Sequence, residues 1–286
     1  RGSHAIAVGA GGATVSTDDA GINWASLTSE ALGVLNAVHV DNATSAVLFG
    51  DGTSLARTTD AGASFKTITT LASGKVKDAT FATAQRGYVL DSRNQLTRSD
   101  DGGITWKVLD LGGAKPEALL APNEKTLLLV GGKGVRRSAD AGLSFKSVGA
   151  SKFRKLKFRS VDRGKGATVV YGDSAAALSK DDGKNFKAIK LNKKIEEVKL
   201  LDFADAKNGW LVDYASELWV TTNGGAKWTR NETNGLGQIK SMARTDSKHG
   251  YLADRSGSIF VTADSGKTWA EQAPFLSAKA VPTLVS

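Results

Sequence analysis

The amino-acid sequence predicts an all-β protein, a seven-bladed β-propeller with four antiparallel strands in each blade. One phrase of eight residues occurs seven times, and successive copies are 39 to 42 residues apart. Short stretches in which apolar and polar residues alternate, as is typical of strands, fill the space between the copies. Four strands in a period of about 40 residues are typical of a propeller blade. Seven such periods account for nearly all of the 286 residues.

The repeated phrase, which we call the box, combines residue types that favour a compact turn. In one copy it reads Ser99-Asp-Asp-Gly-Gly-Ile-Thr-Trp106. The hydroxyl and carboxylate side chains can hydrogen-bond to nearby backbone groups, and glycine adopts a positive φ without strain. The last residue is Trp or Phe, whose ring we expect to be buried beside the turn. The glycines shared by all copies are Gly21, Gly62, Gly103, Gly142, Gly183, Gly225 and Gly266.

One box departs from this pattern. Asn223 stands where the other six copies have Asp. An amide oxygen also accepts hydrogen bonds from backbone N–H groups, so we expect the same turn in this copy.

The segment around one box shows the four strands of a blade. Ala79–Phe81, Gly87–Leu90, Gln95–Arg98 and Trp106–Leu109 each have strand character, and turn residues separate them. No stretch of ten or more residues sustains an apolar stripe with the period of a helix, which argues against folds that alternate strands and helices.

The two ends of the chain predict how the first blade is completed. Ala5–Val8 aligns with the second strand of the other repeats, and Ala280–Val285 aligns with a first strand. We therefore expect the C-terminal strand to complete blade one, with Pro282 at a position that donates no ladder hydrogen bond. Residues 1–4 have the character of an expression-tag remnant, so the prediction is a single domain over residues 5–286.

The composition excludes several kinds of chemistry. The chain has no cysteine, and therefore no disulfide, thiolate metal site or cysteine nucleophile. Its three histidines have no spacing suited to a metal ion, and no glycine-rich loop leads into a helix to bind phosphate. No apolar segment is long enough to span a membrane as a helix. We predict no cofactor and no metal.

Three pairs of segments carry a resemblance to known proteins, because each joins a Gly-aromatic strand to a following box. They are Asn208–Val212 with Leu218–Trp228, Arg86–Leu90 with Ser99–Trp106, and His249–Leu252 with Thr262–Trp269. The chain resembles the BNR or Asp-box repeat families, and in particular the photosystem II stability and assembly factor family with its bacterial relatives. The resemblance implies a seven-bladed propeller in an exported, periplasmic or lumenal setting. It also implies a non-catalytic factor that binds other proteins while a membrane complex is assembled.

Sialidases carry the same box and are the enzymatic alternative. They use an arginine triad, a tyrosine nucleophile with a glutamate partner and an acid, and an Arg-Ile-Pro phrase stands near their start. This chain has no Arg-Ile-Pro phrase and only four tyrosines, of which we expect Tyr88, Tyr214 and Tyr251 to lie in the core. The even spacing of the boxes leaves no room for the long loops from which catalytic propellers build their pockets. We therefore predict that the protein is not an enzyme, with a glycan-binding or sialidase-like propeller as the alternative.

Carboxylates recur just after the second strand of five repeats, where a pair of glycosidase acids could be sought. A hairpin turn favours Asp at this place without any catalytic role, so we interpret them as turn residues. They are Asp51, Asp91, Asp173, Asp213 and Asp254.

The positive charge of the chain is concentrated in one segment. The net charge is +9, and residues 133–199 carry 18 basic and 7 acidic residues. We call the following residues the basic sector: Lys152, Arg154, Lys155, Lys157, Arg159, Arg163, Lys165, Lys193 and Lys194. Such a sector is suited to an acidic protein surface or to anionic lipid headgroups, and its alternative is a surface that only keeps the protein soluble. Nucleic acid is disfavoured because the aromatic residues are used inside the repeats.

Two further sets of basic residues emerge when the repeats are aligned on the box glycine. Lysines stand 26 positions before it at Lys77, Lys157, Lys199 and Lys240, where first strands would place them around one mouth of the central channel. Arginines stand five positions before it at Arg57, Arg98 and Arg137, as an arc over consecutive blades whose planar groups suit carboxylates. Salt bridges between blades are the alternative for both sets.

These observations predict a rigid, non-enzymatic propeller that helps a membrane or envelope protein complex to assemble or to remain stable. We expect a monomer that binds a protein partner with an acidic surface. The residues predicted to bind this partner are Lys77, Arg154, Lys155, Lys157, Arg159, Lys199, Lys240, Arg57, Arg98 and Arg137.

Overall fold

The computed structural model describes residues 5–8, 14–19, 23–27, 35–40, 44–151, 153–195, 197–231, 236–272 and 283–285. In this part of the chain the secondary structure consists of strands and one short 3-10 helix, η2 (Phe153–Lys155). No helix among these residues has the length and apolar character needed to cross a membrane. The predictions for residues 1–4, Gly21, Lys152 and Pro282 lie outside the described residues.

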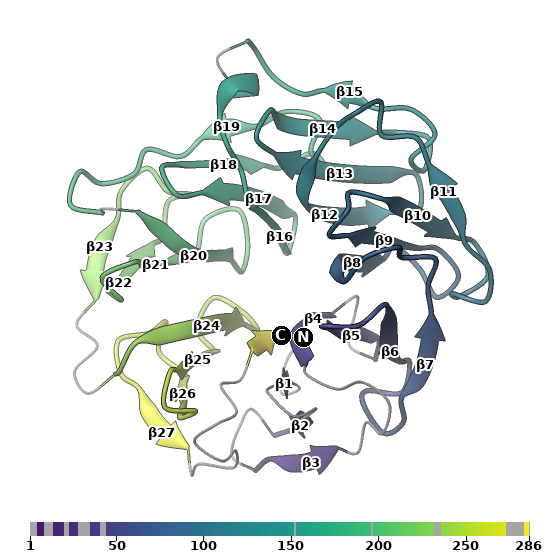
Figure 1. Cartoon of the computed structure of the whole chain (residues 1–286). Helices are drawn as coiled ribbons and strands as arrows, with labels where there is room; N and C mark the ends of the chain where they lie inside the picture. Colours follow the sequence, from purple (N-terminus) through teal and green to yellow (C-terminus); the bar gives the residue numbers. More distant parts are fainter. Residues whose placement is uncertain are drawn as a thin grey trace. The chain divides into compact units, whose positions relative to one another are not determined.

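The strands form seven four-stranded antiparallel sheets (Figure 1). Six sheets each consist of four strands that are consecutive in the chain, and one sheet combines the last strand with the first three. A four-stranded antiparallel sheet of this kind is the blade of a β-propeller. The all-β class and the four-stranded blade predicted from the sequence are therefore confirmed.

The chain divides into two compact units. The first unit comprises Arg1–Thr70, Gly74–Val76 and Glu232–Ser286, and the second comprises Leu71–Ser73 and Lys77–Asn231. Three sheets belong to the first unit and four to the second.

The first unit contains the sheet that joins the two ends of the chain. Its strands are β1 (Ala5–Val8), β2 (Thr14–Thr17), β3 (Ala25–Leu27), β4 (Leu35–Val40), β5 (Ala46–Gly50), β6 (Ser54–Thr58), β7 (Lys66–Thr69), β24 (Ile239–Arg244), β25 (Gly250–Asp254), β26 (Ile259–Thr262), β27 (Ala270–Gln272) and β28 (Thr283–Val285). Strand β28 pairs antiparallel with β1, so that Val285 lies opposite Ile6 and Leu284 opposite Ala7. The predicted pairing of the C-terminal strand with the N-terminal strand is therefore confirmed. Strand β28 also contacts β4 and β24, the first strands of the other two sheets in this unit.

The second unit contains four sheets in chain order. Its strands are β8 (Val76–Phe81), β9 (Gly87–Asp91), β10 (Leu96–Ser99), β11 (Lys107–Leu109), β12 (Pro116–Asn123), β13 (Thr126–Gly131), β14 (Gly134–Ser138), β15 (Lys146–Ser147), β16 (Ser160–Gly164), β17 (Ala167–Gly172), β18 (Ala175–Ser179), β19 (Lys187–Ala188), β20 (Val198–Phe203), β21 (Gly209–Asp213), β22 (Leu218–Thr221) and β23 (Thr229–Asn231). The first strands lie on the inner side of this unit and contact one another from sheet to sheet, as β12 contacts β16 and β16 contacts β20 (Figure 1). The short fourth strands lie on its outer side.

The hydrophobic core lies between neighbouring sheets. Tyr88 and Leu90 of β9, for example, pack in one cluster with Leu119 of β12 and Leu127 of β13. Every residue of β9, β13, β17 and β21 is buried. Burial of apolar surface of this kind is the main favourable contribution to the stability of each blade.

The glycine of the Gly-aromatic phrase is required by close packing. A Cβ at Gly87 would lie 2.4 Å from the ring of Phe81, and a Cβ at Gly209 would lie 2.8 Å from the ring of Phe203. Phe81 in turn packs edge to face on Trp106, with 6.4 Å between the ring centroids. The phrase thus lets a first-strand aromatic ring reach the Trp that closes the box.

The box forms the turn that its residue types predict. In the copy that follows β10, Ser99 Oγ donates to Asp101 Oδ1 at 2.8 Å, and the N–H of Gly103 donates to Ser99 Oγ at 2.8 Å. The N–H of Thr105 donates to the same Asp101 oxygen at 2.8 Å. Gly103 has a φ of 94°, and each of the other five described box glycines has a positive φ as well.

Burial of the closing ring differs between copies of the box. Trp24, Trp106 and Trp228 are buried. The other closing rings are half-buried, which corrects the expectation that every copy buries its ring. They are Phe65, Phe145, Phe186 and Trp269.

The box with asparagine keeps the turn, as predicted. Asn223 Oδ1 accepts from Thr221 Oγ1 at 3.0 Å and from the N–H of Lys227 at 2.9 Å. The N–H of Gly225 donates to Thr221 Oγ1 at 3.0 Å. An amide therefore replaces the carboxylate without loss of the hydrogen bonds that define the turn.

This natural asparagine suggests a test of the box carboxylate at Asp140. Hydrogen bonds from the side chains of Ser138 and Ser144 and from the N–H of Ser144 lower the pKa of Asp140 to about 2. Because the folded-state pKa lies below the unfolded value, the carboxylate stabilises the fold above about pH 4, and this contribution is lost as the pH falls toward 2. Asp140→Asn keeps the hydrogen-bond acceptor and removes the titration.

We expect the difference in thermal unfolding midpoint between the wild type and Asp140→Asn to shrink as the pH is lowered from about 6 to about 2.5. Asp140→Ala removes the acceptor and lowers the midpoint at every pH. Circular dichroism measures these midpoints. A difference between wild type and Asp140→Asn that does not change with pH would contradict the assignment.

Candidate functional site

Three exposed cations of the basic sector lie close together in and just after η2, in the connection between β15 and β16. Arg154, Lys155 and Lys157 are exposed. No carboxylate in the described part of the chain forms a salt bridge with any of these three side chains. We call these three residues the basic face. As cations without an acidic partner inside the described fold, they create a positive potential that is available to an external ligand.

Aromatic packing holds η2 in place. The Phe153 ring stacks on Phe186 with 5.8 Å between centroids and also contacts the buried Phe158, at 5.3 Å. The N–H of Arg154 donates to the carbonyl of Ala150 at 3.1 Å. Because Phe153 is anchored on the inner side of this turn, the neighbouring Arg154 and Lys155 side chains remain at the surface.

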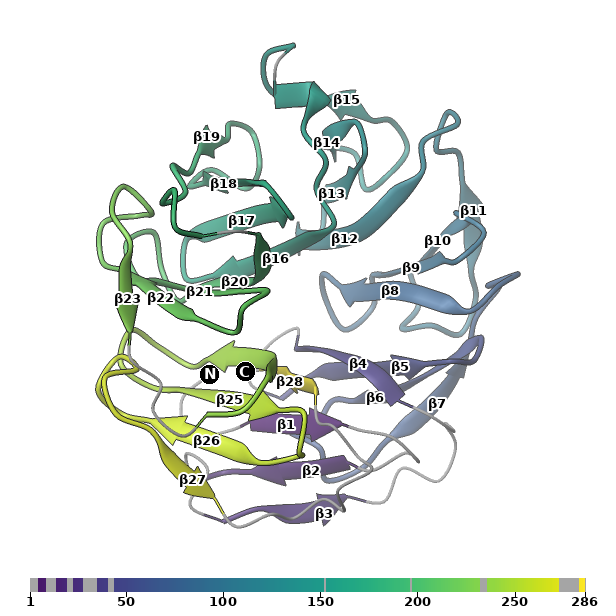
Figure 2. The same cartoon turned by 60° about the vertical axis from the view of Figure 1, so that its left-hand side comes forward.

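The segment that contains η2 is also fixed to the hairpin that joins β13 and β14. In Figure 2, η2 lies beside this hairpin. A Cβ at Gly134 would lie 3.0 Å from the Cα of Arg154, and Gly134 itself has a φ of 81°. The N–H of Phe158 donates to the carbonyl of Gly131 at 3.1 Å. Glycine at position 134 is therefore needed both for the turn and for the close approach of η2.

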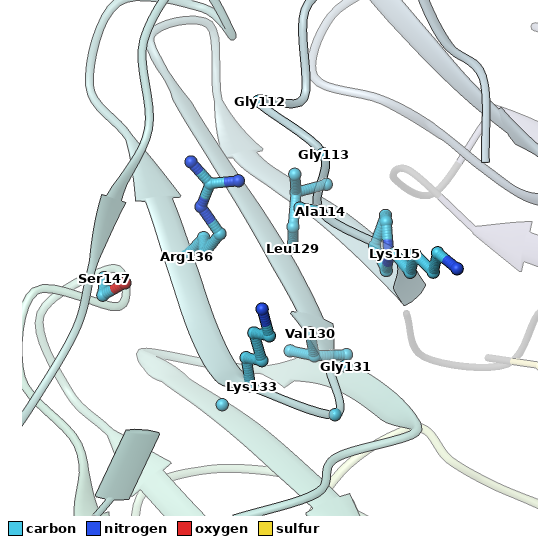
Figure 3. Close-up of a pocket in the computed structure, with 13 residues that line it drawn as sticks. Gly112, Gly113, Ala114, Lys115, Leu129, Val130, Gly131, Lys133, Arg136 and Ser147 are labelled. Carbon is cyan, nitrogen blue, oxygen red and sulfur yellow. The ribbon is translucent and has the colours of Figure 1, made fainter. Parts of the chain in front are cut away.

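A cavity of about 630 Å³ adjoins this same hairpin. It is lined by Gly112, Gly113, Ala114, Lys115, Pro116, Leu129, Val130, Gly131, Gly132, Lys133, Gly134, Arg136 and Ser147. Figure 3 shows Lys133 and Arg136 extending toward the space between the two lining segments, whereas Lys115 points away from it. The lining contains basic side chains and no Asp or Glu.

Arg136 is held in a defined position beside this cavity. Its Nη1 donates to the carbonyl of Leu111 at 2.6 Å. Its guanidinium lies 5.5 Å from the centroid of the Phe145 ring, within the range of a cation–π interaction. The remaining guanidinium edge is therefore preoriented, which lowers the entropy cost of binding an anion.

Arg159, which the sequence places among the partner-binding residues, is engaged inside the protein. Its Nη1 lies 2.7 Å from Asp173 Oδ1 and donates to Tyr214 Oη at 2.5 Å. Its Nη2 donates to the carbonyl of Lys199 at 3.0 Å and also to the carbonyl of Val198. These contacts join the connection before β16 to β20 and to the turn after β21, so Arg159 links neighbouring sheets, and a part in partner binding stays a prediction.

The aligned lysines occupy unlike environments. Lys77 Nζ lies 2.7 Å from Glu117 Oε2 and donates to the carbonyl of Pro116 at 2.9 Å, so it joins β8 to β12. Lys157 is exposed, whereas Lys199 on β20 is half-buried. Lys240 is exposed on β24 of the first unit. The second unit therefore brings Lys157 into the basic face and uses Lys77 for a contact between sheets.

The aligned arginines are largely enclosed. Arg98 Nη1 donates to the carbonyl of Ala141 at 2.8 Å, and Arg137 Nε donates to the carbonyl of Asp182 at 3.0 Å. Both carbonyls belong to the box of the following sheet. Arg57 is 7% exposed, and its Nη2 donates to Ser45 Oγ at 3.5 Å. Arg98 and Arg137 thus contact the neighbouring blade through hydrogen bonds to carbonyl groups, whereas Ser45 directly precedes β5 in the same blade as Arg57, and a part of these arginines in partner binding stays a prediction.

The other residues of the basic sector are dispersed. Arg163 Nη2 pairs with Asp182 Oδ1 at 3.0 Å. Lys165, Lys193 and Lys194 are exposed at other points of the second unit.

All five carboxylates near the ends of the second strands are predicted to serve turns, and three of them accept hydrogen bonds from backbone N–H groups in their turns. Asp91 Oδ1 accepts from the N–H of Arg93 at 2.9 Å and from that of Gln95 at 2.7 Å. Asp213 and Asp254 accept from backbone N–H groups in their turns in the same way. Asp51 instead pairs with Lys75, and Asp173 with Arg159. In the part of the chain described, no three His, Asp or Glu side chains come together as a metal site would require.

The tyrosines follow the prediction in two of three cases. Tyr88 and Tyr251 are 0% and 1% exposed, as expected of core residues. Tyr214 is 52% exposed, which corrects the expectation of burial. It follows β21 in a turn, where its hydroxyl and ring contact Arg159.

The sequence did not single out the cavity beside the hairpin. Its two lining segments, 112–116 and 131–134, are separated in the chain by the length of β12 and β13. The only local signal is a Gly-Gly pair in each segment, which Lys133 follows directly in the second segment and Lys115 follows after one alanine in the first.

The enclosed arginines allow a test of the pairing between blades. Arg137→Ala removes the hydrogen bonds to the carbonyl of Asp182 and to Thr126 Oγ1 and leaves two acceptors without this donor. We expect the free energy of unfolding to fall by about 1 to 3 kcal/mol. Urea denaturation measures this change.

The control is Lys146→Ala, which removes a charge from the exposed residue opposite Arg137 on β15. We expect a change below about 0.5 kcal/mol. Equal effects of the two substitutions would argue against a structural role for Arg137.

Comparison with known proteins agrees with this architecture. Residues 97–108 match the BNR/Asp-box repeat. A solved structure of YCF48 bound to D1 peptide has a TM-score of 0.68 and 14% identity, over 87% of this chain and 90% of that one. YCF48 from Cyanidioschyzon merolae has a TM-score of 0.66 and 16% identity, over 83% of this chain and 84% of that one. No curated protein sequence matches the chain. The predicted resemblance is confirmed: the chain contains a BNR/Asp-box repeat and has a β-propeller fold that is similar to that of YCF48.

Proposed function

We propose that this protein is a non-enzymatic scaffold that binds a partner protein through the basic face, and thereby helps a membrane or envelope complex to assemble. The observation that carries the proposal is the exposure of Arg154, Lys155 and Lys157 on an anchored turn, where no carboxylate of the described residues pairs with them. A fixed cluster of cations favours an acidic protein surface, because complementary charge speeds association and selects the partner.

The fold comparison supports a protein partner. One of the two similar YCF48 structures contains that protein bound to a peptide, D1. A propeller of this type therefore accommodates a peptide ligand, and we extend that ability to this chain.

The wider organisation belongs to the same proposal. The seven sheets would form one closed ring as a single domain over residues 5–286, and the protein would act as a monomer in an exported, periplasmic or lumenal setting. The pairing of β28 with β1 supports closure, because it joins the two ends of the chain in one sheet.

Charge reversal tests the basic face. We expect the combined variant Arg154→Glu, Lys155→Glu and Lys157→Glu to lose its partners when the protein is used for affinity capture from the envelope fraction of the source organism. The wild-type interaction should also weaken steeply with added salt, since exposed charges are screened over about 8 Å at physiological ionic strength. Mass spectrometry identifies the captured proteins.

The matched control is Lys184→Glu, Lys187→Glu and Lys190→Glu, which changes the net charge equally at exposed residues elsewhere in the second unit. We expect this control to keep the partners. Capture that survives reversal of the basic face, or that is lost equally in the control, would refute the proposal.

A further inference from the structure

The cavity beside the β13–β14 hairpin has the charge of a site for an acidic ligand. Lys133 and Arg136 extend toward it, and no Asp or Glu is among its lining residues (Figure 3). Two cations that face the same partly open space repel each other, and a carboxylate between them relieves this repulsion.

The walls of the cavity leave the main chain accessible. A Cβ added at Gly113 or at Gly132 would meet no atom within 4 Å, so open space reaches the backbone at both positions. The two glycines stand on opposite lining segments, 112–116 and 131–134. An extended peptide can therefore approach the main chain closely at both positions.

Other ligand classes fit the lining less well. It contains no aromatic residue, and both sugars and nucleobases rely on aromatic rings for stacking. A space of about 630 Å³ also exceeds the needs of a single inorganic anion. The combination of exposed backbone and cations favours a peptide that carries a carboxylate.

We propose that this cavity binds the side chain of an Asp or Glu residue in an extended segment of the partner protein. The inference rests on the proposed function, because the same segment would continue over the hairpin to the basic face. The geometry favours this path of the peptide from the cavity to the basic face, because Gly134 of the hairpin that lines the cavity lies against the backbone of Arg154. Arg136 supplies a preoriented planar donor, and Lys133 supplies a mobile charge.

A steric block tests the cavity directly. Gly132→Leu fills the open space without backbone strain, because the φ of Gly132 lies outside the left-handed region. The matched control is Gly52→Leu in the equivalent hairpin of the first unit, where a Cβ would come no closer than 3.8 Å to the nearest atom. The probe is a fluorescein-labelled peptide of alternating Gly and Glu, compared with its Gly and Gln counterpart, and fluorescence anisotropy measures the affinity.

We expect the wild type to bind the Glu peptide about tenfold or more tightly than the Gln peptide, the effect of one charge-assisted contact. Gly132→Leu should lower the affinity for the Glu peptide by a similar factor, whereas Gly52→Leu should leave this affinity unchanged. Lys133→Gln should weaken binding of the Glu peptide as well. If Gly132→Leu does not fold, Lys133→Gln alone tests the inference. Equal affinity for the two peptides, or full affinity in a folded Gly132→Leu protein and in Lys133→Gln, overturns the inference.

The two proposals fail in different ways. If reversal of the basic face abolishes capture of the partner while Gly132→Leu and Lys133→Gln leave peptide binding unchanged, the proposed function stands and the cavity site is wrong. If reversal leaves capture unchanged, the proposed function itself is wrong. A competition experiment distinguishes the ligand classes, with glutarate, glucuronate and inorganic phosphate as competitors of the Glu peptide. If glucuronate or phosphate displaces the peptide at a lower concentration than glutarate does, the assignment to a carboxylate-bearing peptide is overturned.

Discussion

The structure depends on a small set of hydrogen bonds that is repeated in the six sheets whose box glycine is described, from a Ser or Thr hydroxyl to an Asp or Asn oxygen and from the glycine N–H to that hydroxyl. The outermost strands need this support, because β15 and β19 have only two residues each and form few ladder hydrogen bonds. The box fixes the chain between the third and fourth strands, so that even a very short outer strand keeps its place. It also presents carbonyl groups to the preceding sheet, and Arg98 and Arg137 bind those of Ala141 and Asp182. One local motif thus contributes both to the inside of a blade and to the contact between blades.

Because the boxes and the core hold the scaffold, charged residues can differ between repeats without loss of the fold. Arginine and lysine side chains in this protein consequently serve two purposes. Arg98, Arg137 and Arg159 contact backbone carbonyls of neighbouring sheets, whereas Arg154, Lys155 and Lys157 extend from an aromatic-anchored turn. The second group is suited to a ligand because its positive charge is not neutralised within the described fold.

Much of the fold could be predicted from the sequence because its determinants are local and repeated. The spacing of the box glycines indicates the sheets, and the strand character of the two chain ends indicates the pairing of β28 with β1. The site was less predictable, because alignment identifies equivalent positions but not the partners of a side chain. Lys77 and Lys157 are equivalent in the alignment, yet Glu117 pairs with the first and η2 precedes the second. The cavity was not predicted at all, since it arises where two glycine pairs distant in the chain meet.

The order of strands in the terminal sheet has a consequence for folding during synthesis. Strands β1, β2 and β3 precede the other described strands in the chain, but β28, which pairs with β1, is the last described strand to be made. Until then β1 has an edge without a partner, and such an edge is prone to pair with other chains. The nascent protein must therefore keep this edge of β1 protected from other chains until β28 has been made.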